Sequence, residues 1–240
     1  MLRDVGYGRA MTPVVLVPGL LCTAEIFAPQ VAVLWPHGPV TVASTLEGTS
    51  MAGMAAAILA DAPPRFALAG LSMGGYVSLE IMRQAPERVS RLALISTQAR
   101  PDAPEQVRLR RAMVAQARGG GFEAVLAQAM RALPHPSQRN DPALGEINQR
   151  MGRVIGVEGF ARQTEAVIAR IDSRPHLPSI SVSTLVLVGD SDPLTPPARA
   201  KEMAGAIPGA RLAVVPECGH VATLEQPEAV NRALVEWITG

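Results

Sequence analysis

The chain has 240 residues, of which 48% are hydrophobic and 18% are charged, and its formal net charge is +1. This composition is ordinary for a globular protein, and the length fits one domain, with or without a small insertion. A nearly neutral chain has no strong field to attract nucleic acid or an anionic membrane, so we expect neither as a partner. The apolar stretch 51–60 is too short to cross a bilayer, which favours a cytoplasmic location. The oligomeric state is left open.

No cofactor or metal is expected from the sequence. The two cysteines, Cys22 and Cys218, lie outside any CxxC pattern, so they indicate neither a disulfide framework nor a zinc site, and we expect buried, inert thiols. No P-loop lysine follows a glycine run, and no GxGxxG opens a helix after a strand. Residues 1–10, which precede Met11, are expected to be a disordered extension or to lie upstream of the true start.

Short apolar runs alternate with helical patterns in the first hundred residues. The runs predict strands at Val14–Val17, Val40–Ala43, Phe66–Ala69 and Leu92–Ile95. The segments between them predict helices at Ala24–Leu34, which Pro29 would interrupt, at Met51–Ala62 and at Met73–Gln84. This alternation is typical of a parallel sheet that is covered by helices on both faces.

The middle of the chain has helical patterns but no convincing strand. Four helices are predicted, at Glu105–Arg118, Phe122–Leu133, Pro142–Val154 and Val157–Ile171. The alternation then resumes with strands at Thr184–Val188 and Arg211–Val215 and helices at Pro197–Ile207 and Pro227–Ile238. We therefore predict an α/β protein with a mostly parallel sheet of about six strands (11–99 and 181–240) and a helical lid insertion (100–180).

The strongest chemical signal is a match to G-x-S-x-G, Gly70-Leu71-Ser72-Met73-Gly74, between a predicted strand and a predicted helix. In a nucleophile elbow the serine sits on a tight, strained turn, and the two glycines relieve crowding around it. The same turn aims the N–H of Met73, at the start of a helix, toward the reacting oxygen. The alternative is a turn of small residues that only packs a helix closely on its strand. The strand–turn–helix context favours the elbow.

A serine nucleophile needs a base, and the base needs an orienting acid. Three of the four histidines, His37, His135 and His176, lie in turns or connectors and are expected to be surface loop residues. His220 follows the last predicted strand, where it can reach the carboxyl edge of the sheet, at which open α/β sheets bind ligands. We predict His220 as the base, against the alternative of a histidine that caps the last helix.

The acid is expected just after the preceding strand, where Asp190 and Asp192 both follow Gly189. Either carboxylate would suit the base, and either could instead serve the turn beside Pro193. Position therefore leaves both candidates open. The chain order Ser72, Asp, His220 is that of α/β-hydrolases.

On these residues the chain resembles the α/β-hydrolase superfamily, in particular small bacterial esterase-like members with a helical lid. The resemblance covers residues 11–240 and is strongest at Val17–Cys22, Leu68–Gly75, Leu185–Pro196 and Val214–Gln226. The family's acid follows a G-x-x-D-x-x-x-P pattern that Asp192 matches and Asp190 does not, so the resemblance implies Asp192. It also implies a second oxyanion donor, the backbone N–H of Leu20, after the first strand.

The chain departs from the family in two places. Many relatives have His-Gly before the oxyanion donor, whereas this chain has Pro18-Gly19, so a loop-stiffening hydrogen bond is lost while the backbone donor is kept. The family's leading antiparallel strands would precede Val14, where little chain is left for them. The resemblance therefore implies a shortened sheet.

The resemblance implies a serine hydrolase that acts on a small carboxylic ester through an acyl-enzyme. Two alternatives stay open. The same triad could hydrolyse thioesters or carbon–carbon bonds, or transfer the acyl group to another acceptor. The fold could also serve a ligand receptor with little turnover, although a complete triad argues against that role.

Overall fold

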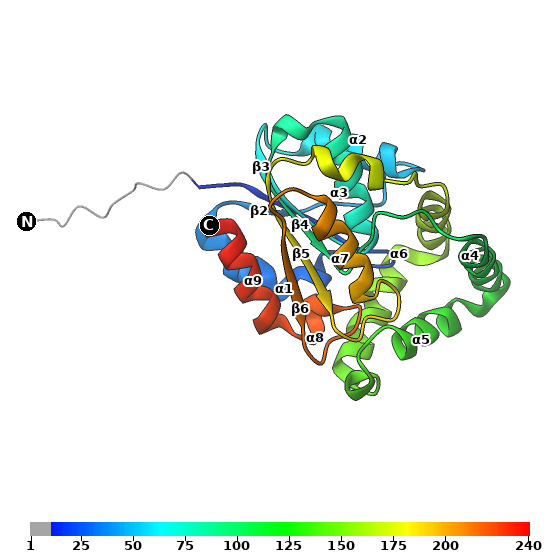
Figure 1. The fold of residues 1–240 in the computed structure, drawn as a ribbon. Coiled ribbons are helices and arrows are strands. Elements are labelled where there is room, and N and C mark those ends of the chain that lie inside the picture. The colour runs from blue at the N-terminus through cyan, green and yellow to red at the C-terminus, as the bar shows by residue number, and fades with distance from the viewer. Residues whose placement is uncertain (1–10) are drawn as a thin grey trace, which may run out of the picture.

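The computed structural model describes residues 11–240, and the expectation for residues 1–10 lies outside this range. A six-stranded sheet in the order β2-β1-β3-β4-β5-β6 forms its centre (Figure 1). The strands are β1 (Val14–Val17), β2 (Val40–Val42), β3 (Phe66–Leu71), β4 (Val89–Ile95), β5 (Ser183–Gly189) and β6 (Arg211–Val215). All neighbouring pairs are parallel, which confirms the predicted α/β sheet.

The strands extend where pairing continues past the apolar run. β3 reaches two residues beyond the predicted end at Ala69, because Gly70 and Leu71 still pair with Leu94 and Ile95 of β4. Every residue of β3 is buried, as is typical of a strand covered by helices on both faces.

Nine α-helices are assigned within the described residues. They are α1 (Ala28–Leu34), α2 (Met51–Asp61), α3 (Met73–Gln84), α4 (Pro104–Gln116), α5 (Phe122–Ala132), α6 (Pro142–Ile168), α7 (Pro197–Ala206), α8 (Ala222–Glu225) and α9 (Pro227–Thr239). α1 and α9 cover one face of the sheet, and α2, α3 and α7 cover the other (Figure 1). None of the described helices is both long and apolar enough to span a bilayer.

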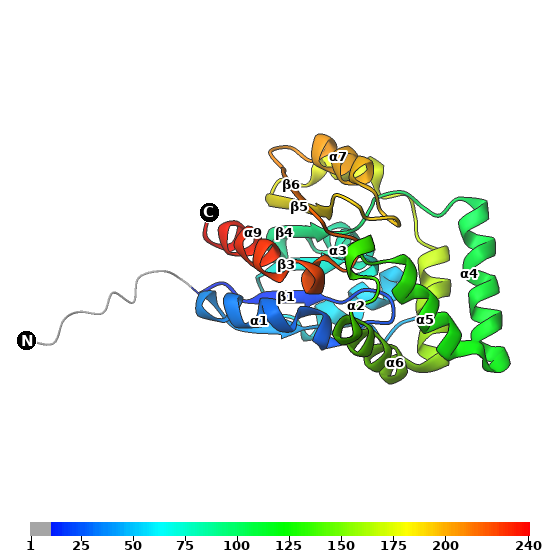
Figure 2. The same ribbon diagram turned by 90° about the horizontal axis from the view of Figure 1, so that it is seen from below.

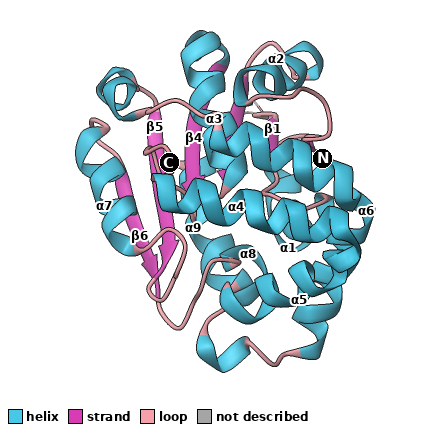
Figure 3. Cartoon of the chain, turned by 90° about the vertical axis from the view of Figure 1, so that its right-hand side faces the viewer, coloured by secondary structure: helices cyan, strands magenta, loops and turns pink. Residues whose placement is uncertain are grey.

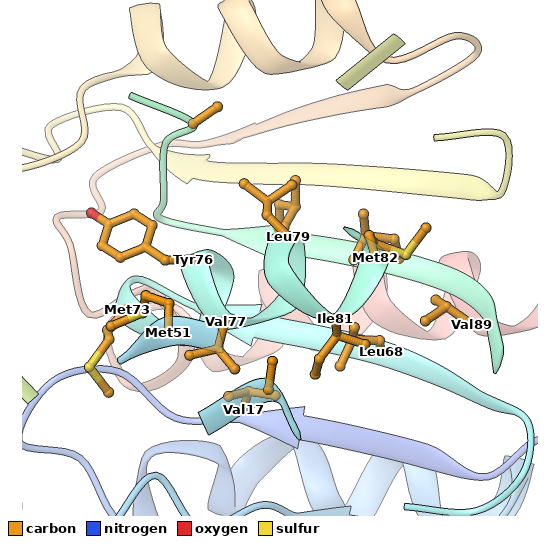
Figure 4. Packing of buried hydrophobic residues seen from close by; sticks show 14 of the residues in the cluster. Val17, Met51, Leu68, Met73, Tyr76, Val77, Leu79, Ile81, Met82 and Val89 are labelled. Atoms are coloured by element: carbon orange, nitrogen blue, oxygen red, sulfur yellow. The ribbon is translucent and has the colours of Figure 1, made fainter. Parts of the chain in front are cut away.

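Alternate residues of each strand supply the two cores. Val15 and Val17 belong to the core under α2, α3 and α7, whereas Val14 and Leu16 belong to the core under α1 and α9. On the first face Val77 and other buried residues of α3 pack against the sheet between β1 and β3 (Figure 4). This packing fixes the position of the first turn of α3, which follows directly on the end of β3.

The predicted helix Ala24–Leu34 is corrected in one respect. A 3-10 turn at Ala24–Phe27 comes first and α1 begins at Ala28, so Pro29 lies in the first turn of α1 rather than inside a helix. Proline is tolerated there because the first N–H groups of a helix have no intrahelical partner.

The segment between β4 and β5 is helical, as predicted, and no strand is assigned to it in the part of the chain that the structure describes. Within α6, Gly156 has φ 70° and ψ 172° and separates the two helices expected on either side of it. Helices α4, α5 and α6 lie beyond the carboxyl ends of the strands (Figures 2 and 3). That residues 100–180 act as a lid stays a prediction.

Candidate active site

Ser72 lies on a sharp turn between β3 and α3. Its φ of 53° and ψ of −114° are strained for a residue with a side chain. The backbone is held on both sides, because its N–H donates to the Ile95 carbonyl (2.9 Å) and its carbonyl accepts from the Thr97 hydroxyl (2.8 Å). The turn lifts the Ser72 side chain, which is partly exposed, off the end of the strand.

Steric crowding explains why residues 70 and 74 are glycines. A Cβ on Gly74 would lie 1.9 Å from the Val17 carbonyl oxygen, and a Cβ on Gly70 would lie 2.2 Å from the Gly74 oxygen. Both obstacles are backbone atoms, which cannot rotate away. The close contact of α3 with β1 and β3 therefore depends on these two glycines.

Gly74→Ala is expected to destabilise the protein by about 1–3 kcal/mol or more, because the added methyl forces α3 away from β1. Gly145→Ala is a matched control, since Gly145 lies in α6 and a Cβ added to it would meet no neighbouring atom within 4 Å. That change should be neutral or stabilise by about 0.5–1 kcal/mol. Urea unfolding of both variants measures the difference. Equal stabilities would show that α3 has room to move.

The structure brings Ser72, His220 and Asp192 into one hydrogen-bonded chain. Ser72 Oγ lies 2.8 Å from His220 Nε2, and His220 Nδ1 lies 2.8 Å from Asp192 Oδ2. A proton on Nδ1 directed at the carboxylate leaves Nε2 free to accept the serine proton. His220 is 5% exposed and Asp192 is 3% exposed, so the polar pair is shielded from water.

Asp192 is surrounded by donors. Its Oδ1 accepts the N–H groups of Leu194 (2.9 Å) and Thr195 (2.8 Å), and its Oδ2 accepts the Thr195 hydroxyl (2.8 Å). Burial alone would raise the pKa of Asp192, but the neighbouring His220 ring and the hydrogen bonds from His220 and Thr195 hold that pKa below its ordinary value. Asp192 is therefore a carboxylate at neutral pH, oriented by four contacts.

Asp190, in the same loop, has different hydrogen-bond partners. It accepts the backbone N–H groups of Glu217 (3.1 Å) and Cys218 (3.2 Å) in the turn that leads to His220. Partial burial would raise the pKa of Asp190, but these two hydrogen bonds lower it on balance. The two candidate acids thus have different environments, and only Asp192 is hydrogen-bonded to His220 in the described structure.

The Gly19–Cys22 turn after β1 lies against Ser72. A Cβ on Gly19 would be 3.4 Å from the Cβ of Ser72, so the neighbouring Leu20 is close to the same point. Met73, whose N–H is the other expected donor, is the first residue of α3. Both backbone groups therefore belong to segments that meet at Ser72.

Two residues that hold the His220 loop, Glu225 and Leu133, were not anticipated from the sequence. Glu225, a buried residue of α8, accepts the N–H groups of Gly219 (2.8 Å) and Val221 (2.7 Å), one on each side of His220. The His220 N–H donates to the Leu133 carbonyl (2.9 Å), at the end of α5.

The spacing of Thr195, three residues after Asp192, is typical of an Asp-capped turn and could have indicated its role.

Neither cysteine is an activated nucleophile. Burial raises the pKa of the Cys22 thiol to about 12, and its Sγ is 3.4 Å from the Leu20 carbonyl oxygen. Burial, followed by the nearby carboxylates, also raises the pKa of Cys218. Both thiols are therefore protonated at neutral pH. Within residues 11–240 no group of three or more His, Cys, Asp and Glu residues is arranged to hold a metal ion.

A family model described as the alpha/beta hydrolase family matches residues 14–233. The chain belongs to the alpha/beta hydrolase family. This membership confirms the resemblance, the α/β-hydrolase fold and the enzyme class inferred from the sequence.

Relatives of this alpha/beta hydrolase are named for different activities. A thermophilic esterase from Thermogutta terrifontis is 31% identical, with a TM-score of 0.85 over 95% of this chain and 89% of that one. An enol-lactonase from Burkholderia xenovorans LB400 is 27% identical, with a TM-score of 0.88 over 96% and 92%. A Mycobacterium tuberculosis protein provisionally named non-heme bromoperoxidase BpoC is 30% identical over 75% of this chain and 69% of its own.

Proposed function

We propose that this alpha/beta hydrolase cleaves small carboxylic esters through an acyl-enzyme formed on Ser72. The observation that carries the proposal is the continuous hydrogen-bonded chain from Ser72 Oγ through His220 to Asp192, with 2.8 Å at each link. A serine hydroxyl at this distance from an imidazole that a carboxylate orients is the arrangement that activates serine for attack on a carbonyl.

The reaction follows from the roles that the geometry supports. Ser72 Oγ attacks the ester carbonyl while His220 Nε2 takes its proton, and Asp192 stabilises the resulting imidazolium. The N–H groups of Leu20 and Met73 donate to the oxygen that becomes negative. His220 returns the proton to the departing alcohol. A water molecule then attacks the acyl carbonyl while His220 takes its proton, and the bond to Ser72 breaks as His220 returns that proton to Ser72 Oγ.

The choice of an ester rests on the relatives together with the site. The Thermogutta terrifontis protein is named an esterase, and the Burkholderia xenovorans protein is named an enol-lactonase, whose substrate is an internal ester. Both chains superpose on nearly the whole of this one. We infer a carboxylic ester as the substrate class here as well, with residues 100–180 as the lid that shapes the pocket.

A fluorophosphonate is expected to label Ser72 and no other serine. Intact-mass measurement should show one equivalent of reagent, and peptide mapping should place it on Ser72. Among the described serines only Ser72 is hydrogen-bonded to a histidine that a carboxylate orients, and it is partly exposed. Ser78 provides an internal comparison, since it is buried in α3 and donates to the Gly74 carbonyl (2.7 Å).

An activity assay of the same sample distinguishes a hydrolase from a ligand receptor with little turnover. An activated p-nitrophenyl ester should give a burst of one equivalent of p-nitrophenol followed by steady turnover. A protein that takes up the fluorophosphonate but shows no turnover would contradict the hydrolase proposal. An unlabelled protein, or one labelled on Ser78, would remove Ser72 as the nucleophile.

A further inference from the structure

We propose that Gln163, on α6, is a positioning residue that sets the conformation of the turn carrying the Leu20 N–H. The inference rests on the proposed role of that turn in the oxyanion hole. Gln163 is 142 residues distant in sequence from Leu21, and its side chain contacts the turn from α6, which lies beyond the carboxyl ends of the strands (Figure 2). It is assigned no contact with reacting atoms and would act through the backbone of the turn.

The turn is strained. The Cys22 N–H donates to the Gly19 carbonyl (3.2 Å), which closes a four-residue turn with Leu20 and Leu21 at its centre. Leu21 has φ 62°, whereas Leu20 is not among the described residues with positive φ. A positive φ at the third residue but not at the second is the pattern of a type II turn, in which the third position favours glycine. A leucine persists there only where its surroundings hold it.

The Gln163 side chain supplies one such constraint. Its Oε1 accepts the Leu21 N–H (3.1 Å), which belongs to the central peptide of the turn. Its Nε2 donates to Thr45 Oγ1 (2.9 Å), in the loop after β2. Gln163 is 1% exposed, so water does not compete for these contacts. The amide therefore connects α6 to the loops after two neighbouring strands.

The two contacts also define which way the amide points. Turning it by 180° would set its NH2 group against the Leu21 N–H, two donors facing each other. Its oxygen would then face the Thr45 carbonyl, which now lies 3.5 Å from Nε2, and two acceptors would face each other. Thr45 thus keeps the Gln163 oxygen directed at Leu21.

The central peptide of a turn can point in either of two directions, and these distinguish type I from type II. Type I needs no positive φ, so it suits leucine better than type II does. The bond from the Leu21 N–H to Gln163 selects type II. Without an acceptor this N–H would be left unpaired in a partly buried place, and the central peptide would turn over. The flip itself reorients the Leu20 carbonyl and the Leu21 N–H, and we expect the adjoining Gly19–Leu20 peptide, which carries the Leu20 N–H, to adjust with it and to move relative to Ser72.

The test replaces Gln163 with methionine, which has a similar shape and no acceptor. We expect kcat to fall about 10–100-fold, since small misplacement of a catalytic group costs up to about 10²-fold. KM should stay within about threefold. Thr164→Val is the matched control, because Thr164 is the next residue of α6, is buried, and has a hydroxyl with no partner among the described residues. Its kcat should equal that of the wild type.

A boronic acid inhibitor separates positioning from a general effect on the lid. Its adduct with Ser72 places a negative tetrahedral group in the oxyanion hole, so its Ki for Gln163→Met should rise by the same factor as kcat falls. A structural effect on substrate binding would instead raise KM and leave kcat unchanged. Circular dichroism checks that the variant is folded. Where it is not, Gln163→Asn, too short to reach Leu21 and Thr45 together, is expected to show the same losses.

The inference fails if folded Gln163→Met or Gln163→Asn keeps a kcat within twofold of Thr164→Val while the wild type is labelled at Ser72. It fails equally if kcat falls but the boronic acid Ki does not change. A wild type that is not labelled at Ser72 would instead overturn the proposed function itself. Failure of the inference is therefore seen in the Gln163 variants, whereas failure of the proposed function is seen in the wild type.

Discussion

Replacing Ser72 with alanine is expected to lower kcat for an activated ester at least about 10³-fold and to leave the fold intact. The reason is that alanine leaves only binding and oxyanion effects, which account for a small part of the rate when the nucleophile is absent. Alanine removes a hydroxyl that His220 alone contacts among the described residues, so the turn and α3 should keep their positions. Steady-state kinetics of purified protein measures the loss.

Ser78→Ala is the control for this variant. Ser78 lies in α3, the helix that follows Ser72, and its hydroxyl donates to the Gly74 carbonyl, so its loss should lower stability slightly and leave kcat near that of the wild type. A second check uses the non-additivity of groups that act together. Ser72→Ala with His220→Ala should cost no more than Ser72→Ala alone. Full activity in Ser72→Ala would assign the nucleophile elsewhere.

The sheet could be predicted from the sequence because its strands are short apolar runs between breakers. Val14–Val17 ends at Pro18-Gly19 and was predicted to the residue, as was Arg211–Val215. β3 and β5 extend past the predicted ends at Ala69 and Val188, because pairing with neighbours continues through Gly70 and Gly189, which carry no hydrophobic signal. β4 ends at Ile95 as predicted but begins earlier, at Val89, because the polar residues Ser90 and Arg91 interrupt the apolar run.

The arrangement of the site residues follows from the topology, since each leaves the carboxyl end of a parallel strand. Val17 pairs with Gly70, and Gly189 pairs with Val215, so the loops after β1, β3, β5 and β6 open at one edge. The choice between Asp190 and Asp192 did not follow from position alone. It needed either the family spacing or the orientation of each carboxylate.

Two of the residues that hold the site in place, Gln163 and Glu225, could not be predicted from the sequence. Gln163 and Leu21 are 142 residues apart, and the periodicity of α6 indicates which face is buried but not which polar group it meets. A buried glutamine in a helix is equally compatible with many partners. Glu225 is a similar case. Its carboxylate accepts the backbone N–H groups on either side of His220, and no sequence pattern indicates these contacts.

The second large effect is expected for Asp192→Asn, which should lower kcat about 10⁴-fold by analogy with serine proteases, while the protein stays folded. An asparagine amide can accept the Thr195 N–H, so the loop can be kept. It can also donate to His220 Nδ1, which would shift the ring proton to Nε2 and direct it at Ser72 Oγ. The imidazole could then no longer take the serine proton.

Asp190→Asn is the matched comparison, two residues away in the same loop. It weakens the contacts to the Glu217 and Cys218 N–H groups, so it should lower stability by about 1 kcal/mol with kcat within a few-fold of the wild type. The pKa of Asp190 is lowered in the folded state from the ordinary value of 3.8, so its contribution is complete above that value and is lost as the pH falls through the folded pKa. The difference in Tm between Asp190→Asn and the wild type should therefore be full at pH 7 and shrink as the pH falls below 3.8. If Asp190→Asn abolished turnover and Asp192→Asn lowered only Tm, Asp190 would be the acid that orients His220.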